Sequence, residues 1–193
     1  MSTAQNNLIT RNVDGTEVPV VGSWAIDPGH AEVAFIGRHF MLTKVRGRFT
    51  DVVGTVVIAD DPADSSADVT INMASVESGS DDRDNHLRSS DFFDVENHPE
   101  GRFRSTSVTL NGDTARVSGE LTLVGITRPV VLDVLYVGST VDPWGGHRAI
   151  YSASTEINRE DWGLTWNVAL EAGGLLVSKK IRIELELETV RQG

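Results

Sequence analysis

The chain has 193 residues, a length that suits a single domain, and its 39% hydrophobic content argues against a disordered chain. Its 28 acidic and 17 basic residues give a net charge of −11, which argues against general binding to nucleic-acid phosphates. There is no cysteine, so disulfides, zinc–thiolate sites and thiol catalysis are excluded.

Residues 1–22 are polar and predict a flexible arm or an added edge strand in front of the main domain, residues 23–193. They lack the continuous apolar core of a signal peptide, and no stretch of the chain reaches the about 20 apolar residues of a membrane helix. We therefore expect a cytoplasmic protein without a transmembrane segment. The exposed edge at residues 16–21 would allow a homodimer by addition to a neighbour's sheet.

From Ser23 onward, short alternating runs broken by turn residues predict strands. The clearest run is the last, residues 180–188, where every odd residue is aliphatic and every even one is charged. Since a strand sends successive side chains to opposite faces, one face of this run is buried and the other faces water. Gly47 and Gly54 predict a bulge or bend within a long strand. Further strands are predicted at residues 31–39, 45–60, 68–75, 102–110, 114–124, 148–157 and from 130 onward.

Turn residues predict how these strands connect. Asn111-Gly112 predicts a tight type I′ hairpin, because Asn-Gly supplies the positive φ angles of that turn. Residues 125–129 and 143–146 predict the next two turns. His30 is expected to hold a tight turn by hydrogen bonding near Asp27.

Residues 80–95 break the alternation and begin with acids, which favour the positive end of a helix. We expect a short helix there, lying across one mouth of the fold, and a smaller helical turn at residues 40–44. About eight strands with one buried face each must close or stack, and eight strands close around a lumen that holds one small ligand. The sequence therefore predicts an all-β protein, a single closed antiparallel β-barrel with a helical lid.

A series of sequence blocks supports this architecture. They are residues 24–30 (WAIDPGH) with Val33–Phe35 and His39, residues 47–49, residues 83–94 (RDNHLRSSDFFD), residues 103–106, residues 119–130 (GELTLVGITRPV) and residues 157–164 (INREDWGL). In content and order they resemble the YceI-like, lipocalin-like family, from Trp24 to the C-terminus. The resemblance implies an extended barrel that binds polyisoprenoids or related amphiphilic chains in its lumen.

Large apolar residues on inward strand faces or on the lid are the candidate lumen lining. They are Phe35, Phe40, Leu87, Phe92, Phe93, Phe103, Leu123, Trp162 and Trp166. The alternative is that the same side chains simply fill the core, as they do in some small barrels. Small residues within strands favour a cavity, since a filled core would use Leu or Ile there; these are Ala34, Gly47, Ser105, Gly119 and Ala153.

A phosphate or other polar head on the ligand would need hydrogen-bond donors at a barrel mouth. The candidate headgroup contacts are Arg38, His39, Arg83, His86, Arg88 and Arg159, because guanidinium groups grip phosphate through two bonds. For Arg83 and Arg88 the favoured alternative is pairing with neighbouring acids, which would only order the lid; the acids are Asp82, Asp84, Asp91 and Asp94.

Two other classes of function stay open. The five histidines show no metal-ligand spacing, and no nucleotide loop or nucleophile elbow occurs, so we expect no metal, no cofactor and no enzyme. An enzyme would most plausibly use His39 or His86 for acid–base isomerisation of a bound lipid. A structural or stress-related dimer without specific cargo would require a packed lumen.

Overall fold

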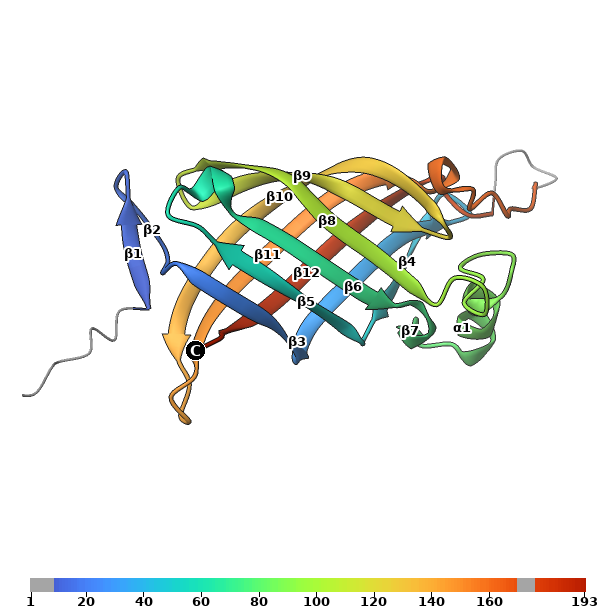
Figure 1. The fold of residues 1–193 in the computed structure, drawn as a ribbon. Helices are drawn as coiled ribbons and strands as arrows, with labels where there is room; N and C mark the ends of the chain where they lie inside the picture. Colours follow the sequence, from blue (N-terminus) through green and yellow to red (C-terminus); the bar gives the residue numbers. More distant parts are fainter. Residues whose placement is uncertain (1–8, 170–175) are drawn as a thin grey trace, which may run out of the picture.

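Strands make up most of the protein in its computed structural model, which describes residues 9–169 and 176–193 (Figure 1). Helical structure is limited to α1 (Asp81–Arg88) and to 3₁₀ turns at Pro62–Asp64, Met73–Ser75 and Arg159–Trp162 within these residues. The strands are β1 (Thr10–Val13), β2 (Thr16–Pro19), β3 (Gly22–His39), β4 (Thr43–Phe49), β5 (Val52–Ile58), β6 (Ser66–Asn72), β7 (Val76–Glu77), β8 (Glu100–Asn111), β9 (Thr114–Leu123), β10 (Ile126–Val141), β11 (His147–Asn158) and β12 (Lys180–Arg191).

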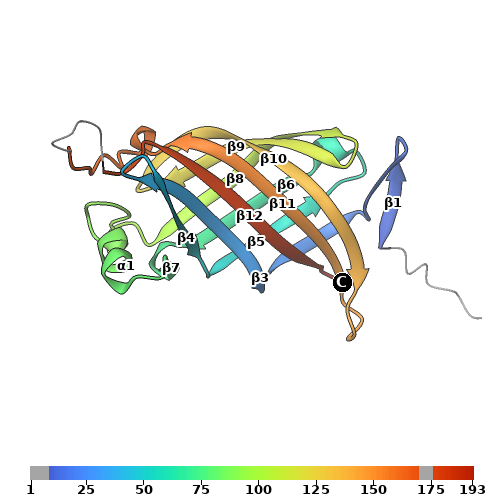
Figure 2. The same ribbon diagram turned by 180° about the vertical axis from the view of Figure 1, so that it is seen from behind.

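The long strand β3 closes the sheet into a barrel by pairing along both of its edges. One edge pairs with β12, and the other pairs with β5 through Gly22–Ala25 and with β4 through Val33–His39. Because β4 and β5 follow each other along the same edge, they act as one bent strand. The ring continues through β6, β8, β9, β10 and β11 back to β12. Within the described residues, eight antiparallel strands thus form the closed barrel that the sequence predicts (Figures 1 and 2).

The alternation in β12 explains its place in the wall. Its charged residues Arg182 and Glu186 are exposed, and Glu184 accepts a hydrogen bond from Arg46 on β4 at 2.7 Å. Burial of each large aliphatic side chain contributes about 1.5–3 kcal/mol relative to exposure, so only one face of the strand can turn inward. The inward residues are Ile181, Ile183, Leu185 and Leu187.

The hairpin between β8 and β9 is confirmed, but its loop lies one residue later than predicted. Asn111 pairs with Thr114, so the two loop residues are Gly112 and Asp113. Among them only Gly112 has a positive φ, 64°. A positive φ at the first loop position alone is the pattern of a type II′ turn, and the type I′ prediction is wrong here.

The loop between β9 and β10 is shorter than predicted. It consists of Val124 and Gly125, whose φ angles of 48° and 73° fit a type I′ turn. Residues 126–129, expected within the turn, pair with β9 as the start of β10. The predicted turn at residues 143–146 is present, and the side chain of Asp142 accepts hydrogen bonds from the backbone amides of Trp144 and Gly146.

The smaller helical turn predicted at residues 40–44 is absent from the described structure. Phe40 and Met41 have φ angles of 54° and 59°, which are left-handed values and turn the chain from β3 into β4. The predicted bend at Gly47 or Gly54 lies instead at residues 50–51, between β4 and β5. There the hydroxyl of Ser75 accepts hydrogen bonds from both backbone amides at 3.2 and 3.1 Å.

Different elements lie across the two ends of the barrel (Figures 1 and 2). At one end lies α1, which contributes the buried Leu87, together with the loop that carries the buried Phe93. At the opposite end lies the hairpin of β1 and β2, which forms a sheet separate from the barrel. This hairpin buries Val18 and fixes Arg11 to the chain after β5. Among the described residues, no helix has the length and apolar character needed to span a bilayer.

Candidate binding site in the barrel lumen

A cavity of about 510 Å³ lies inside the barrel. Its size is within the range of about 300–1,000 Å³ that is usual for small-molecule sites, and aliphatic and aromatic side chains dominate its lining. Every strand of the ring contributes to the wall, for example through Phe35, Val56, Val69, Phe103, Val117, Leu132, Ala153 and Leu185. The lining also includes residues from both end elements, so the cavity extends along the barrel.

Most of the predicted lining residues do face this cavity. They are Phe35, Leu87, Phe92, Phe93, Phe103, Leu123 and Trp166. The other two predicted residues do not line this cavity. Phe40 lies on the turn after β3 and is 49% exposed. Trp162 is 3% exposed and packs in the hydrophobic core, where its indole N–H donates to the backbone carbonyl of Leu121 at 2.9 Å.

The small residues do not all leave empty space, contrary to the prediction. A Cβ on Gly47 would lie 2.3 Å from the ring of Phe35, and one on Gly119 would lie 2.5 Å from the ring of Phe103. These glycines therefore make room for aromatic rings. The hydroxyl of Ser105 accepts a hydrogen bond from a backbone amide of β6 at 2.8 Å. Of the remaining two, Ala153 faces the cavity, whereas Ala34 pairs with the outward-facing Glu184 and Arg48, so its side chain points to the outer face of the wall.

An aromatic cluster lines the lumen at the α1 end. The ring of His86 contacts Phe92 and Trp166 edge-on, with centroid distances of 5.0 and 4.6 Å. Its Nε2 lies 2.9 Å from a carboxylate oxygen of Asp91. His86 is thus held in a defined orientation at the mouth of the lumen.

The lid arginines have partners other than those expected. Arg88 donates to the carbonyls of Ala74 and Val76 at 2.9 and 2.7 Å and does not line the cavity, so its prediction as a headgroup contact is not supported by its position. Arg83 donates to the hydroxyl and the carbonyl of Ser78 at 2.7 and 2.8 Å, and it does line the cavity. The expected pairing with the neighbouring aspartates is therefore wrong, although both arginines do order the lid.

Arg159 is a charged group buried in the wall near the same end. It is 4% exposed, and its Nε donates to the carbonyl of Ser178 at 3.0 Å while Nη1 donates to that of Leu164. Its Nη2 is buried without a hydrogen-bond partner among the described residues. Burial lowers the pKa of this guanidinium, which still stays protonated. Arg38 and His39 also line this region of the cavity.

Two tyrosines were missed by the sequence prediction. Tyr136 and Tyr151 face the cavity from neighbouring positions on β10 and β11. Burial raises the pKa of Tyr151, whose hydroxyl lacks a hydrogen-bond partner among the described residues. The alternation of the strand could have predicted this, because Tyr151 is two residues before the inward-facing Ala153 and therefore points to the same face.

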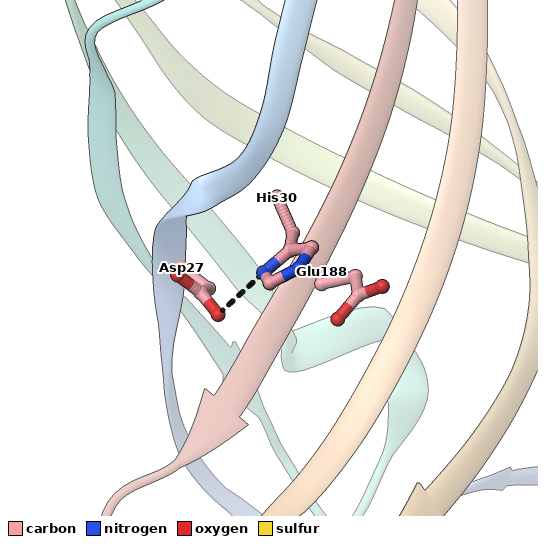
Figure 3. A group of neighbouring side chains, drawn as sticks. All are labelled: Asp27, His30 and Glu188. Atoms are coloured by element: carbon pink, nitrogen blue, oxygen red, sulfur yellow. Dashed lines mark hydrogen bonds and ion pairs between the residues drawn. The ribbon is translucent and has the colours of Figure 1, made fainter.

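A cluster on the outer wall has the residue types of a metal site (Figure 3). Ligand atoms of Asp27, His30 and Glu188 lie within 4.8 Å of one another. However, Arg148 already donates to Asp27 at 2.6 Å and to Glu188 at 3.1 Å, so these carboxylates have a cation. His30 Nδ1 lies 3.0 Å from Asp27, in agreement with the predicted hydrogen bond that holds the turn. We assign the cluster a structural role.

Sequence comparison places the chain among known proteins. The family model described as YceI-like domain matches residues 24–189. Protein YceI of Escherichia coli O6:H1 is 37% identical over 164 residues, which cover 84% of this chain and 83% of the relative. A UPF0312 protein of Pseudomonas aeruginosa is 35% identical with the same coverage.

Solved structures share the fold. A YceI protein of Campylobacter jejuni is 26% identical and superposes with a TM-score of 0.69 over 81% of this chain and 90% of its own. BcnA of Burkholderia cenocepacia has a TM-score of 0.72 at 20% identity, covering 84% of this chain and 98% of its own. A polyisoprenoid-binding domain of Saccharophagus degradans has a TM-score of 0.66 at 17% identity, covering 90% and 100%.

Proposed function

This chain belongs to the family of proteins with a YceI-like domain, and we propose that it binds a polyisoprenoid or a similar long-chain amphiphile in its lumen and carries or stores it. The observation that supports this most is the elongated apolar cavity of about 510 Å³. Each CH₂ group buried there contributes about 0.8 kcal/mol, so a long chain gains affinity along its whole length. The Saccharophagus degradans domain, named for polyisoprenoid binding, has the same fold.

The α1 end is the proposed place for the headgroup. A buried charge is costly without a partner of opposite sign, and the hydrogen bonds of Arg159 go to backbone carbonyls only, among the described residues. An anionic head would supply that partner. Arg38, His39, Arg83 and His86 line the same region and are the further proposed headgroup contacts.

The alternatives lack comparable support. Acid–base chemistry by His86 would require it to exchange the carboxylate of Asp91, 2.9 Å away, for a ligand. A purely structural dimer calls for a packed lumen, whereas this lumen is open. We therefore favour a binding protein over an enzyme, and a cytoplasmic location and a homodimer stay predictions.

Blocking the lumen tests the proposal directly. Ala153 faces the lumen, whereas Ser154, the next residue of β11, pairs with the outward charged residues Asp133 and Glu184. Ala153→Trp should weaken binding of geranylgeranyl diphosphate, measured by calorimetry, by about tenfold or more because the indole occupies the chain's volume. Ser154→Trp is the matched control and should stay within about twofold. Equal affinities in the two variants, or no binding by the unmodified protein, would contradict the proposal.

A further inference from the structure

The end of the lumen opposite α1 contains polar atoms that the apolar cavity does not satisfy. Both Tyr151 and Arg11 line the cavity, and each has a buried polar atom without a hydrogen-bond partner among the described residues. These atoms are the hydroxyl oxygen of Tyr151 and Nε of Arg11. An unsatisfied buried polar group costs about 1–3 kcal/mol, so a partner from outside the protein is favoured.

The tyrosine hydroxyl belongs to a small polar zone at this end. Tyr151 pairs in register with Tyr136, and their ring centroids lie 5.8 Å apart. The hydroxyl of Tyr136 donates to Ser139 at 2.6 Å, while its backbone amide donates to the carbonyl of Asp113 in the β8–β9 loop. Burial raises the pKa of Tyr136, the bond to Ser139 opposes this, and the charge of Glu17 adds to the rise. β2 contacts β10, the strand that carries Tyr136.

The second unsatisfied donor comes from the hairpin across this end of the barrel (Figure 1). Arg11 on β1 donates through Nη1 and Nη2 to the carbonyls of Asp60 and Ala59, which follow β5. These bonds fix the guanidinium. Its remaining donor, Nε, is buried without a partner among the described residues, and Arg11 is one of the residues that line the cavity. Arg11 lies outside residues 24–189, which the family model matches.

We propose that this end of the lumen is a second polar subsite, which accepts an oxygen atom at the tail of the bound chain. A guanidinium only donates hydrogen bonds and a phenol donates readily, so the complementary group is an acceptor oxygen of a hydroxyl, carbonyl or carboxylate. The proposal rests on the proposed lumenal function and adds to it a preference for chains that also have an oxygen atom at the tail.

The length of the ligand follows from the position of the two subsites. Arg159 comes eight residues after Tyr151, along and just beyond β11. At the rise of an extended strand this separation corresponds to roughly 26 Å. Only a chain long enough to span most of this length would contact both ends, so the preference for a terminal oxygen should depend on chain length.

A competition experiment with full-length protein tests this subsite. Dodecanoic, hexadecanoic and octadecanoic acids and their ω-hydroxy analogues would each displace the fluorescent cis-parinaric acid. We expect the ω-hydroxyl to improve affinity relative to the plain acid for the longer chains only. In Tyr151→Phe this ratio should fall about fivefold, while the affinity for plain acids changes less than about twofold. Tyr136→Phe is the matched control and should change the ratio less, because Ser139 already pairs with that hydroxyl.

Arg11→Met tests the second donor in the same assay, with Arg116→Met on the outer wall as its control. The ω-hydroxyl preference should fall about threefold in the first variant and stay unchanged in the second. Equal affinity of the unmodified protein for plain and hydroxylated chains, or a preference that persists in Tyr151→Phe, would overturn the subsite alone. If cis-parinaric acid and all acids fail to bind, the lumenal function fails as well.

Discussion

Arg159 combines a buried charge with a donor, Nη2, that has no partner among the described residues, and its role is testable through the charge of the ligand. Arg159→Gln should lower the affinity for geranylgeranyl diphosphate about tenfold or more, because a hydrogen bond to a charged group contributes about 1.5–3 kcal/mol. Geranylgeraniol has the same chain without the phosphates. The affinity of the variant for it should stay within about threefold of that of the unmodified protein, which would show that the lumen is folded. Calorimetry measures both, and an equal loss for the two ligands would argue against a headgroup contact.

Asp27 gives the fold a measurable acid sensitivity. Hydrogen bonds from Arg148, and then from His30, lower the pKa of Asp27 from 3.8 to about 2. The folded state therefore binds the proton less tightly than the unfolded state, and this stabilisation is complete above about pH 4 and lost as the pH falls to about 2. Asp27→Asn should lower the free energy of unfolding by about 1–2 kcal/mol at pH 6.

The difference between Asp27→Asn and the unmodified protein should shrink towards zero near pH 2 in urea titrations. The control is Asp133→Asn, since Asp133 is 77% exposed on the outer wall and should show little effect at either pH. A stability difference that does not change between pH 6 and pH 2 would contradict the assignment.

Residue types predicted part of the site and misplaced the rest for identifiable reasons. Hydrophobicity and alternation located Phe35 and Phe103 on inward faces, where they line the lumen. The same criterion failed for Trp162, because its indole N–H needs a carbonyl and finds one in the wall. It also passed over Tyr151, since a search for apolar side chains ignores a phenol that turns inward.

At the scale of elements, one glycine lets two strands of the barrel approach closely. A Cβ on Gly54 of β5 would lie 2.4 Å from the backbone carbonyl of Asp68 on β6, which cannot rotate away. We expect Gly54→Ala to lower the free energy of unfolding by about 1–3 kcal/mol, measured by urea titration. Gly29→Ala is the control, because its nearest neighbour would be 3.4 Å away, an ordinary contact. A neutral Gly54→Ala would indicate that the sheet is looser at this point.

Strands were more predictable than the loops that join them. The charge alternation of β12 specified its faces without any tertiary information. The β8–β9 loop was displaced by one residue because cross-strand register, which pairs Asn111 with Thr114, decides where a hairpin turns. Likewise, Phe40 and Met41 take left-handed φ angles that only the closure of β3 onto β4 requires.

At the scale of the whole molecule, the barrel has chemically different ends. The α1 end contains basic residues and an aromatic cluster, while the tyrosine pair lines the lumen towards the other end, where the β1–β2 hairpin lies. We propose that residues 23–193 form the folding unit and that the hairpin docks on it through Arg11 and Val18. If both proposed subsites exist, the apolar middle sets the length of the ligand and the two ends set its orientation.

Native mass spectrometry of the protein purified without detergent or added lipid tests the central claim most directly. A lumen that binds an amphiphilic chain should retain one, seen as a single added mass that denaturation releases and organic extraction identifies as a long-chain lipid. The same preparation of Ala153→Trp should show the mass of the protein alone. Unmodified protein that is free of lipid, and that takes up no long-chain isoprenoid or fatty chain offered in excess, would contradict the account.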